Sequence, residues 1–211
     1  MSKTRVVTIS HATGAGGDSV GRGVATDLGF RYIDEEIITL AAERHGVDPE
    51  LVADAERRKS VLDRILDDMA APSMMIEPTG GMTMLPPEAF VTREHLRALI
   101  VEAIEETAAR GQVVIVSHAA GIPLAGRPDV LRVLVTASFE SRTRRLADAT
   151  RGTKADVEKS LKLSDAGRAD YFLRFYRIER ELPTHYDLVI NTDTLTPAEA
   201  IDIVIAAARR H

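Results

Sequence analysis

The sequence predicts an α/β fold, a parallel β-sheet with helices on its faces, and three observations predict it. An apolar run at residues 6–10 leads into a glycine-rich loop and then into a helical pattern. Strand-like and helix-like segments continue to alternate along the chain, which is the order that builds parallel sheets. A second apolar stretch, residues 30–34, ends in Asp34. A parallel strand would deliver this carboxylate to the edge where such sheets bind ligands.

The loop after the first strand is the first candidate site. It contains Gly14, Gly16 and Gly17. A loop between a strand and a helix can aim backbone N–H groups, and the positive end of the helix, at a phosphate. The phosphate-loop pattern G-x-x-x-x-G-K-[ST] requires a lysine, and Gly17 stands in its place. A glycine-rich turn that only joins a strand to a helix would have a similar composition.

The remaining elements follow in chain order. A helix at about residues 20–28 ends at Gly29, and the segment that begins at Thr92 has apolar residues at helical spacing. This spacing predicts a long helix that packs on the sheet. Other helices are expected over residues 35–44 and 51–69, and other strands over 32–34, 113–117, 131–136 and 188–191.

Residues 70–89 interrupt this alternation. The segment is rich in proline and glycine and contains four methionines, which are Met74, Met75, Met82 and Met84. Methionines on a loop can cover a ligand or line a homodimer interface. A surface loop that packs on the core explains them as well.

Composition excludes several classes of protein. A chain of 211 residues with 45% hydrophobic residues and a net charge of -5 predicts one globular domain over residues 1–211. The chain contains no cysteine, so it has neither disulfides nor a thiolate metal site. The six histidines lack metal-ligand spacing, which argues against zinc. No signal peptide and no membrane-spanning run is found, and we therefore expect a cytoplasmic protein.

Positive charge is concentrated in the second half of the chain. Residues 138–180 contain 11 Lys and Arg against 7 Asp and Glu. The excess suggests contact with a polyanion, although a helix surface of mixed sign would look similar. Binding of nucleic acid or of a membrane surface would need a more continuous basic face. We therefore expect neither as a partner.

Several segments together resemble the cytidylate kinases, in particular their divergent group with a G-S-G-G loop. Residues 6–34, 113–145 and 165–207 carry the resemblance, which covers most of the chain. Residues 134–145 are similar to the strand-then-helix run T-A-S-x-E-x-R-x-x-R, and residues 186–192 resemble the final strand of the family. The resemblance implies a three-layer P-loop NTPase fold with a parallel five-stranded sheet and a basic lid at about residues 142–180.

The resemblance also implies a function. Such enzymes move the γ-phosphate of ATP, with Mg²⁺, to a small nucleotide, here CMP or dCMP, and catalysis relies on positioning and positive charge. Ser19 falls where the family has its magnesium-contacting Ser or Thr, although an ordinary serine at a helix N-terminus would occupy the same place. The ATP phosphates would be held by Gly14, Ala15, Gly16, Gly17 and Asp18.

Other residues match the acceptor side of the family. Asp165 and Arg168 match its D-x-x-R motif, in which the two side chains contact the nucleoside monophosphate. Their spacing also suits a surface ion pair within one helix. Asp34 would lie beside the acceptor pocket, and a helix cap is the alternative. His118 stands where relatives have an arginine, and imidazole cannot supply the same permanent charge.

Arginines of the basic region are candidates for the closing lid. Arg142, Arg145 and Arg174 would neutralise the transferred phosphoryl group together with Arg168, and Arg151 is a further candidate. The aromatic residues that follow Arg168 at helical spacing are Tyr171, Phe172 and Phe175. Core packing explains them better than base stacking does.

The departures from the family concentrate at the chemistry. They are His11 for the first loop glycine, Gly17 for lysine, Asp18 for glycine, and Leu40 and His118 for arginines. A charge-assisted contact contributes about 1.5–3 kcal/mol, so three lost positive charges could lower the rate by several powers of ten. A nucleotide-binding sensor or scaffold without turnover is therefore the alternative function. A dinucleotide-dependent oxidoreductase is disfavoured, because the loop departs from G-x-G-x-x-G.

Overall fold

The computed structural model describes residues 4–34, 37, 39, 42, 93–116, 119–150 and 153–211. The helix expected over 51–69, the loop over 70–89, and Leu40, His118 and Arg151 lie outside the described residues, as does most of the helix expected over 35–44.

Five parallel strands form one sheet. They are β1 (Val6–His11), β2 (Arg31–Ile33), β3 (Val113–Val116), β4 (Val130–Thr136) and β5 (Leu188–Asn191). Their order across the sheet is β2-β3-β1-β4-β5. The strand β1 therefore occupies the centre, where Val7 pairs with Val114 on one side and with Leu131 on the other. The parallel sheet predicted from the sequence is confirmed.

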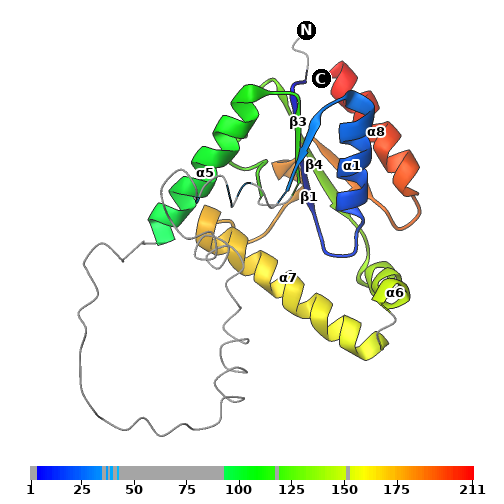
Figure 1. Cartoon of the computed structure of the whole chain (residues 1–211). Coiled ribbons are helices and arrows are strands. Elements are labelled where there is room, and N and C mark those ends of the chain that lie inside the picture. Colours follow the sequence, from blue (N-terminus) through cyan, green and yellow to red (C-terminus); the bar gives the residue numbers. More distant parts are fainter. Residues whose placement is uncertain are drawn as a thin grey trace, which may run out of the picture.

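Helices cover both faces of the sheet (Figure 1). The helices α1 (Gly17–Leu28) and α8 (Pro197–Arg210) pack together on one face, and α5 (Arg93–Arg110) lies on the other. Both faces are apolar, because β1 has Val7 and Ile9 in the cluster on the α1 side and Val6 in the cluster on the α5 side. The arrangement has the three layers expected of a P-loop fold.

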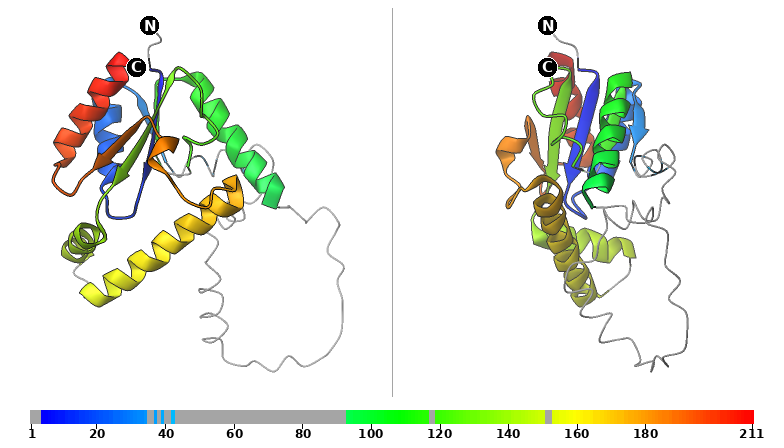
Figure 2. Two further views of the ribbon diagram at one scale, coloured as in Figure 1. Left: turned by 180° about the vertical axis from the view of Figure 1, so that it is seen from behind. Right: turned by 90° about the vertical axis from the view of Figure 1, so that its left-hand side faces the viewer.

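Two helices lie beyond the carboxyl ends of the strands. The helix α6 (Phe139–Thr150) follows β4, and the long helix α7 (Lys154–Tyr176) crosses below the sheet (Figure 1). Two further views, in Figure 2, show the same crossing of α7. A short 3₁₀ turn, η2 (Pro183–His185), precedes β5. The region expected to form the lid thus lies at the same edge of the sheet as the glycine loop.

Helix ends follow local chemistry. Thr153 caps α7 by accepting a hydrogen bond from the Asp156 N–H, and Thr196 forms a capping box with Glu199 at the start of α8. The helix α1 begins at Gly17, three residues earlier than the apolar pattern indicates, because residues 17–19 carry no apolar side chain. Asp34 follows β2 instead of ending it.

Candidate functional site

The loop between β1 and α1 has the backbone of an anion-binding loop. Gly14 and Gly16 have φ angles of 80° and 85°, in the left-handed region that favours glycine. Gly16 is the N-cap of α1 and no side chain caps that end. The first N–H groups of any helix lack acceptors within the helix, and its N-terminus attracts negative charge. The Ala15 N–H is engaged within the loop, because it donates to the Ala12 carbonyl at 2.9 Å.

The position of the missing lysine is filled by another side chain. A Cβ atom added to Gly17 would lie 2.3 Å from Cβ and Cγ of His11, so the His11 side chain occupies the space of a side chain at position 17. The His11 Nε2 lies 3.3 Å from Asp18 Oδ1. This contact, above all, lowers the pKa of the Asp18 carboxyl. Three departures noted in the sequence are therefore neighbours in space.

The outer side of the loop is held by three side chains. The Arg142 Nη1 donates to the Thr13 carbonyl at 3.2 Å, and the Arg145 Nη1 approaches the Gly14 carbonyl at 3.4 Å. The Thr192 Oγ1 donates to the Ala15 carbonyl at 2.8 Å. These donors come from α6 and from the residue after β5.

Arg142 links the loop to α7. Its guanidinium donates two hydrogen bonds to the Asp165 carboxylate, at 2.9 and 2.7 Å, a geometry that suits the planar arginine group. The Arg142 side chain is 7% exposed and that of Asp165 is 39% exposed. The Thr13 hydroxyl adds a second link, 2.6 Å from the Ser164 hydroxyl.

Arg168 does not form an ion pair with Asp165. Such a pair within one helix was the alternative to acceptor binding that the D-x-x-R spacing allowed. The Arg168 guanidinium instead donates to both oxygens of Glu181, at 2.8 and 2.7 Å, and to the Ser10 hydroxyl at 2.7 Å. The Tyr186 hydroxyl also donates to Glu181, and burial, followed by the nearby Glu181 charge, raises the pKa of Tyr186. Arg168 is thereby fixed at the end of β1, beside the loop.

The aromatic residues of α7 pack in the core, as expected. Tyr171, Phe172 and Phe175 are each at most 8% exposed, and the rings of Tyr171 and Phe175 stack with centroids 4.5 Å apart. The Arg168 guanidinium lies over the Phe172 ring at 5.0 Å. Arg174 pairs with Asp170 within the same helix and is farther along it from the loop.

The remaining predicted residues lie around the same edge or outside the described chain. Asp18 and Ser19 are exposed in the first turn of α1. Asp34 is half-buried, and its carboxylate accepts a hydrogen bond from the Tyr32 hydroxyl at 3.5 Å. Burial, followed by the Asp34 charge, raises the pKa of Tyr32 to about 12.

Four contacts in this site were missed by sequence reasoning. They involve Ser10, Ser164, Glu181 and Thr192. Ser10 and Thr192 carried a usable signal, because each lies at the carboxyl end of a strand, where ligands of parallel sheets bind. Ser164 and Glu181 carried none, since polar residues are common on exposed helices and turns.

The described residues suit a phosphate better than a bare metal ion. A Cβ atom on Gly16 would meet nothing within 4 Å, so the space before the helix N-terminus is open. In the part of the chain that the structure describes, no three His, Asp or Glu side chains gather as a metal site. A magnesium ion here would therefore need ligands from the phosphates themselves.

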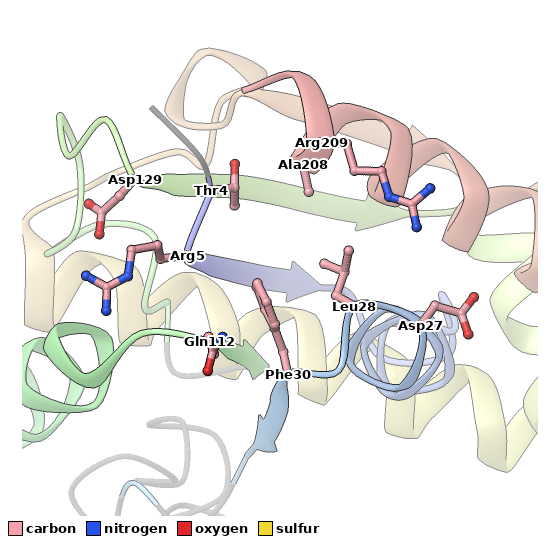
Figure 3. A pocket seen from close by; sticks show the side chains of 9 residues that line it. All are labelled: Thr4, Arg5, Asp27, Leu28, Phe30, Gln112, Asp129, Ala208 and Arg209. Atoms are coloured by element: carbon pink, nitrogen blue, oxygen red, sulfur yellow. The ribbon is translucent and has the colours of Figure 1, made fainter. Parts of the chain in front are cut away.

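A separate cavity lies at the opposite edge of the sheet. Its volume is about 890 Å³, and Thr4, Gln112 and Asp129, which line it, each lie next to the amino end of a strand. Figure 3 shows it between the start of β1 and the ends of α1 and α8. Parallel sheets bind their ligands at the carboxyl ends of the strands, so this cavity is distinct from the candidate site.

Comparison with known proteins points to one group of enzymes. Residues 6–194 match the model of the cytidylate kinase-like family. The cytidylate kinase of Mycolicibacterium paratuberculosis is 28% identical over 218 residues, which cover 96% of this chain and 94% of that protein. The cytidylate kinase of Mycobacterium avium is 27% identical over 216 residues, with the same coverage.

Solved structures share the fold at low sequence identity. An uncharacterised protein from Eubacterium ventriosum superposes with a TM-score of 0.66 at 13% identity, over 99% of this chain and all of that one. A sugar kinase from Janibacter superposes with a TM-score of 0.50 at 15% identity, over 99% of both chains. At these identities the likeness concerns the fold alone. Among the described helices none is long and apolar enough to cross a membrane.

Proposed function

Because the chain belongs to the cytidylate kinase-like family, we propose that it transfers the γ-phosphate of Mg-ATP to a nucleoside monophosphate, with CMP or dCMP as the acceptor. One observation carries the proposal. The uncapped N-terminus of α1, behind a loop with two left-handed glycines, faces open space at the edge where α6 and α7 bring their arginines. A cytoplasmic location, where both nucleotides are available, fits this activity.

The chain's own residues would divide the work between binding and neutralisation. Amides of Gly14, Gly16, Gly17 and Asp18 would hold the ATP phosphates, with Ala15 shaping the loop, and Ser19 would offer its hydroxyl to the metal ion. Bound Mg-ATP supplies the phosphoryl group and part of the neutralising charge. Asp34 and Asp165 would face the acceptor, together with His118, which lies outside the described residues.

Positive charge around the transferred group would come from four arginines. Arg142 and Arg145 contribute theirs from behind the loop, while Arg168 and Arg174 contribute from α7. Arg168 is the candidate for the acceptor phosphate, because its planar group can hold two phosphate oxygens. To hold two phosphate oxygens through Nε and Nη2, it would have to exchange Glu181 for that phosphate, since Glu181 now accepts from both of these atoms.

A nucleotide-binding sensor without turnover is the second candidate. Two observations favour it. Position 17 has no lysine and is closed by His11, and Arg142, Arg168 and Arg174 are each already paired with a carboxylate. A phosphate must compete with these carboxylates for each arginine. Such a protein would bind ATP and release it unchanged.

Direct measurement of transferred phosphoryl label distinguishes the two candidates. The protein is incubated with Mg-ATP and a panel of nucleoside monophosphates, including deoxy forms. We expect transfer to CMP or dCMP, and no transfer in Gly16→Val, whose branched side chain fills the phosphate space and is strained at a φ of 85°. Gly126→Val is the matched control, because Gly126 has a φ of 81° and open surroundings away from the loop.

Two further variants test the acceptor side in the same assay. Arg168→Ala should raise the KM for the acceptor about tenfold or more, because a charge-assisted contact is lost. Glu181→Gln should lower that KM, because Arg168 then loses a competing carboxylate. ATP binding without transfer to any acceptor would favour the sensor. Unchanged ATP affinity in Gly16→Val would contradict the phosphate-loop assignment itself.

A further inference from the structure

Three consecutive carbonyl groups of the phosphate loop each face a side-chain donor. Thr13, Gly14 and Ala15 follow one another, and each directs its carbonyl at a different side-chain donor, from Arg142, Arg145 and Thr192 respectively. A peptide group has its N–H and C=O on opposite sides. Holding these carbonyls outward therefore restricts the directions in which the loop amides point.

Thr192 is the hub of this arrangement. It is 5% exposed, and its hydroxyl lies 2.8 Å from the Ala15 carbonyl and 3.0 Å from Arg145 Nη1. A hydroxyl donates one proton and accepts others. Since Arg145 can only donate, the Thr192 lone pair accepts from it. Two carbonyls are within reach of the Thr192 proton, and that of Ala15, at 2.8 Å, is nearer than that of Thr136, at 3.2 Å, so the proton goes to Ala15.

The neighbours of Thr192 leave it little freedom to turn away. Its own N–H donates to the Thr136 carbonyl at 2.8 Å, as a continuation of the β4–β5 ladder. Arg145 also donates to the Thr192 carbonyl. The next residue, Asp193, accepts a hydrogen bond from the Ser138 N–H at 2.8 Å and so ties the start of α6 to the end of β5. The hydroxyl therefore has a fixed position against the loop.

We propose that Thr192 is a positioning residue, which with Arg145 and Arg142 holds the phosphate loop in its anion-binding conformation. This inference rests on the proposed function for its ligand, which is the polyphosphate of ATP. Loops that lack the lysine depend on backbone amides to bind phosphate. Fixing those amides before binding reduces the conformational entropy lost on binding.

The test compares two substitutions that differ in one group. Thr192→Val keeps the shape of the side chain but removes the hydroxyl, and Thr192→Ser keeps the hydroxyl. We expect Thr192→Val to raise the Kd for ATP about 5- to 10-fold, as for the loss of the buried hydrogen bond to the Ala15 carbonyl of the loop, and to leave the KM for the acceptor within twofold. Thr192→Ser should stay within about twofold of the wild type in both. Thr192→Ala replaces Thr192→Val should the latter not fold.

A second readout does not depend on ATP. Backbone ¹⁵N order parameters of Gly14 and Gly16 should fall in Thr192→Val and remain at wild-type values in Thr192→Ser. Wild-type order parameters together with wild-type ATP affinity in Thr192→Val would overturn the inference, as would equal effects of Val and Ser. Should the wild type fail to bind ATP, the proposed function falls, while the order parameters still decide whether Thr192 positions the loop.

Discussion

At the scale of single residues, the pair His11 and Gly17 decides what the loop can contain. The His11 side chain fills the space beside the Gly17 Cα. The two departures from the usual phosphate-loop pattern, His11 for glycine and Gly17 for lysine, depend on each other. A lysine at position 17 would need the space that His11 takes. The space of a side chain at position 17 is thus taken by the imidazole of His11, next to the Asp18 carboxylate.

This coupling predicts an unusual response to a mild substitution. Replacing glycine by alanine in a helix normally stabilises by about 1 kcal/mol. Gly17→Ala should instead destabilise by about 1–3 kcal/mol, because the added Cβ overlaps His11, and the loss should vanish in a His11→Gly background. Urea unfolding of the four proteins of this cycle measures the coupling. An equally stable Gly17→Ala would show that His11 moves aside at no cost.

The same overlap decides whether a lysine can be restored. Gly17→Lys alone should fold poorly, because its side chain, like that of alanine at this position, overlaps His11. The double variant His11→Gly with Gly17→Lys should bind ATP more tightly than the wild type, by about 10-fold or more, because a charge-assisted contact is added. Isothermal titration with ATP checks this, and weaker binding by the double variant would contradict the placement of the phosphates.

At the scale of elements, the edge strand β5 depends on an arginine–aspartate contact. Asp187, directly before β5, accepts three hydrogen bonds from Arg132 of β4, from its backbone N–H, Nε and Nη2. The Asp187 N–H in turn donates to the Arg132 carbonyl at 2.8 Å. Because β5 has only four residues, this contact sets its register and hence the place of Thr192.

Removing this contact should weaken the fold in a pH-dependent way. Burial opposes ionisation of Asp187, but the hydrogen bonds from Arg132 outweigh it and lower the pKa of the carboxyl. A lowered pKa means that the stabilisation is present above the unfolded value of about 4 and is lost as the pH falls below it. Asp187→Asn should lower the free energy of unfolding by about 1–3 kcal/mol at pH 7.

Chemical unfolding at several pH values measures this difference. The gap between wild type and Asp187→Asn should shrink between pH 5 and pH 3. The exposed Asp202 of α8 provides a matched control, since Asp202→Asn should change stability by less than about 0.5 kcal/mol. A gap that stays constant down to pH 3 would show that the Asp187 charge does not contribute.

At the scale of the whole molecule, the two edges of the sheet have different roles. The carboxyl edge carries the loop and the arginines of α6 and α7, while the amino edge carries the 890 Å³ cavity. Arg209 lines that cavity and is exposed. Arg209→Gln should therefore leave the Kd for ATP within about twofold of the wild type. A tenfold loss of ATP affinity in Arg209→Gln would show that our proposal places the nucleotide at the wrong edge of the sheet.

Much of this architecture was predictable from the chain alone. The strands and the loop depend on residues close together in sequence. Apolar runs, glycines and helix-capping residues are therefore enough to indicate where they lie. The alternation of strands and helices gave the parallel sheet, and the resemblance to cytidylate kinases pointed to the family. The start of α1 was misplaced because its first three residues, Gly17, Asp18 and Ser19, carry no apolar side chain that would mark them as helical.

The partners of the charged side chains were decided only by the tertiary structure. The sequence by itself determined that Asp165 and Arg168 share one face of a helix, and at that spacing each could pair with the other. In the structure, Asp165 contacts Arg142 and Arg168 contacts Glu181 and Ser10. Thr192 reaches the loop across 177 positions of the chain. Such contacts depend on how strands and helices pack, because an ion pair forms wherever folding brings opposite charges together, and sequence spacing measures only the local part of that distance.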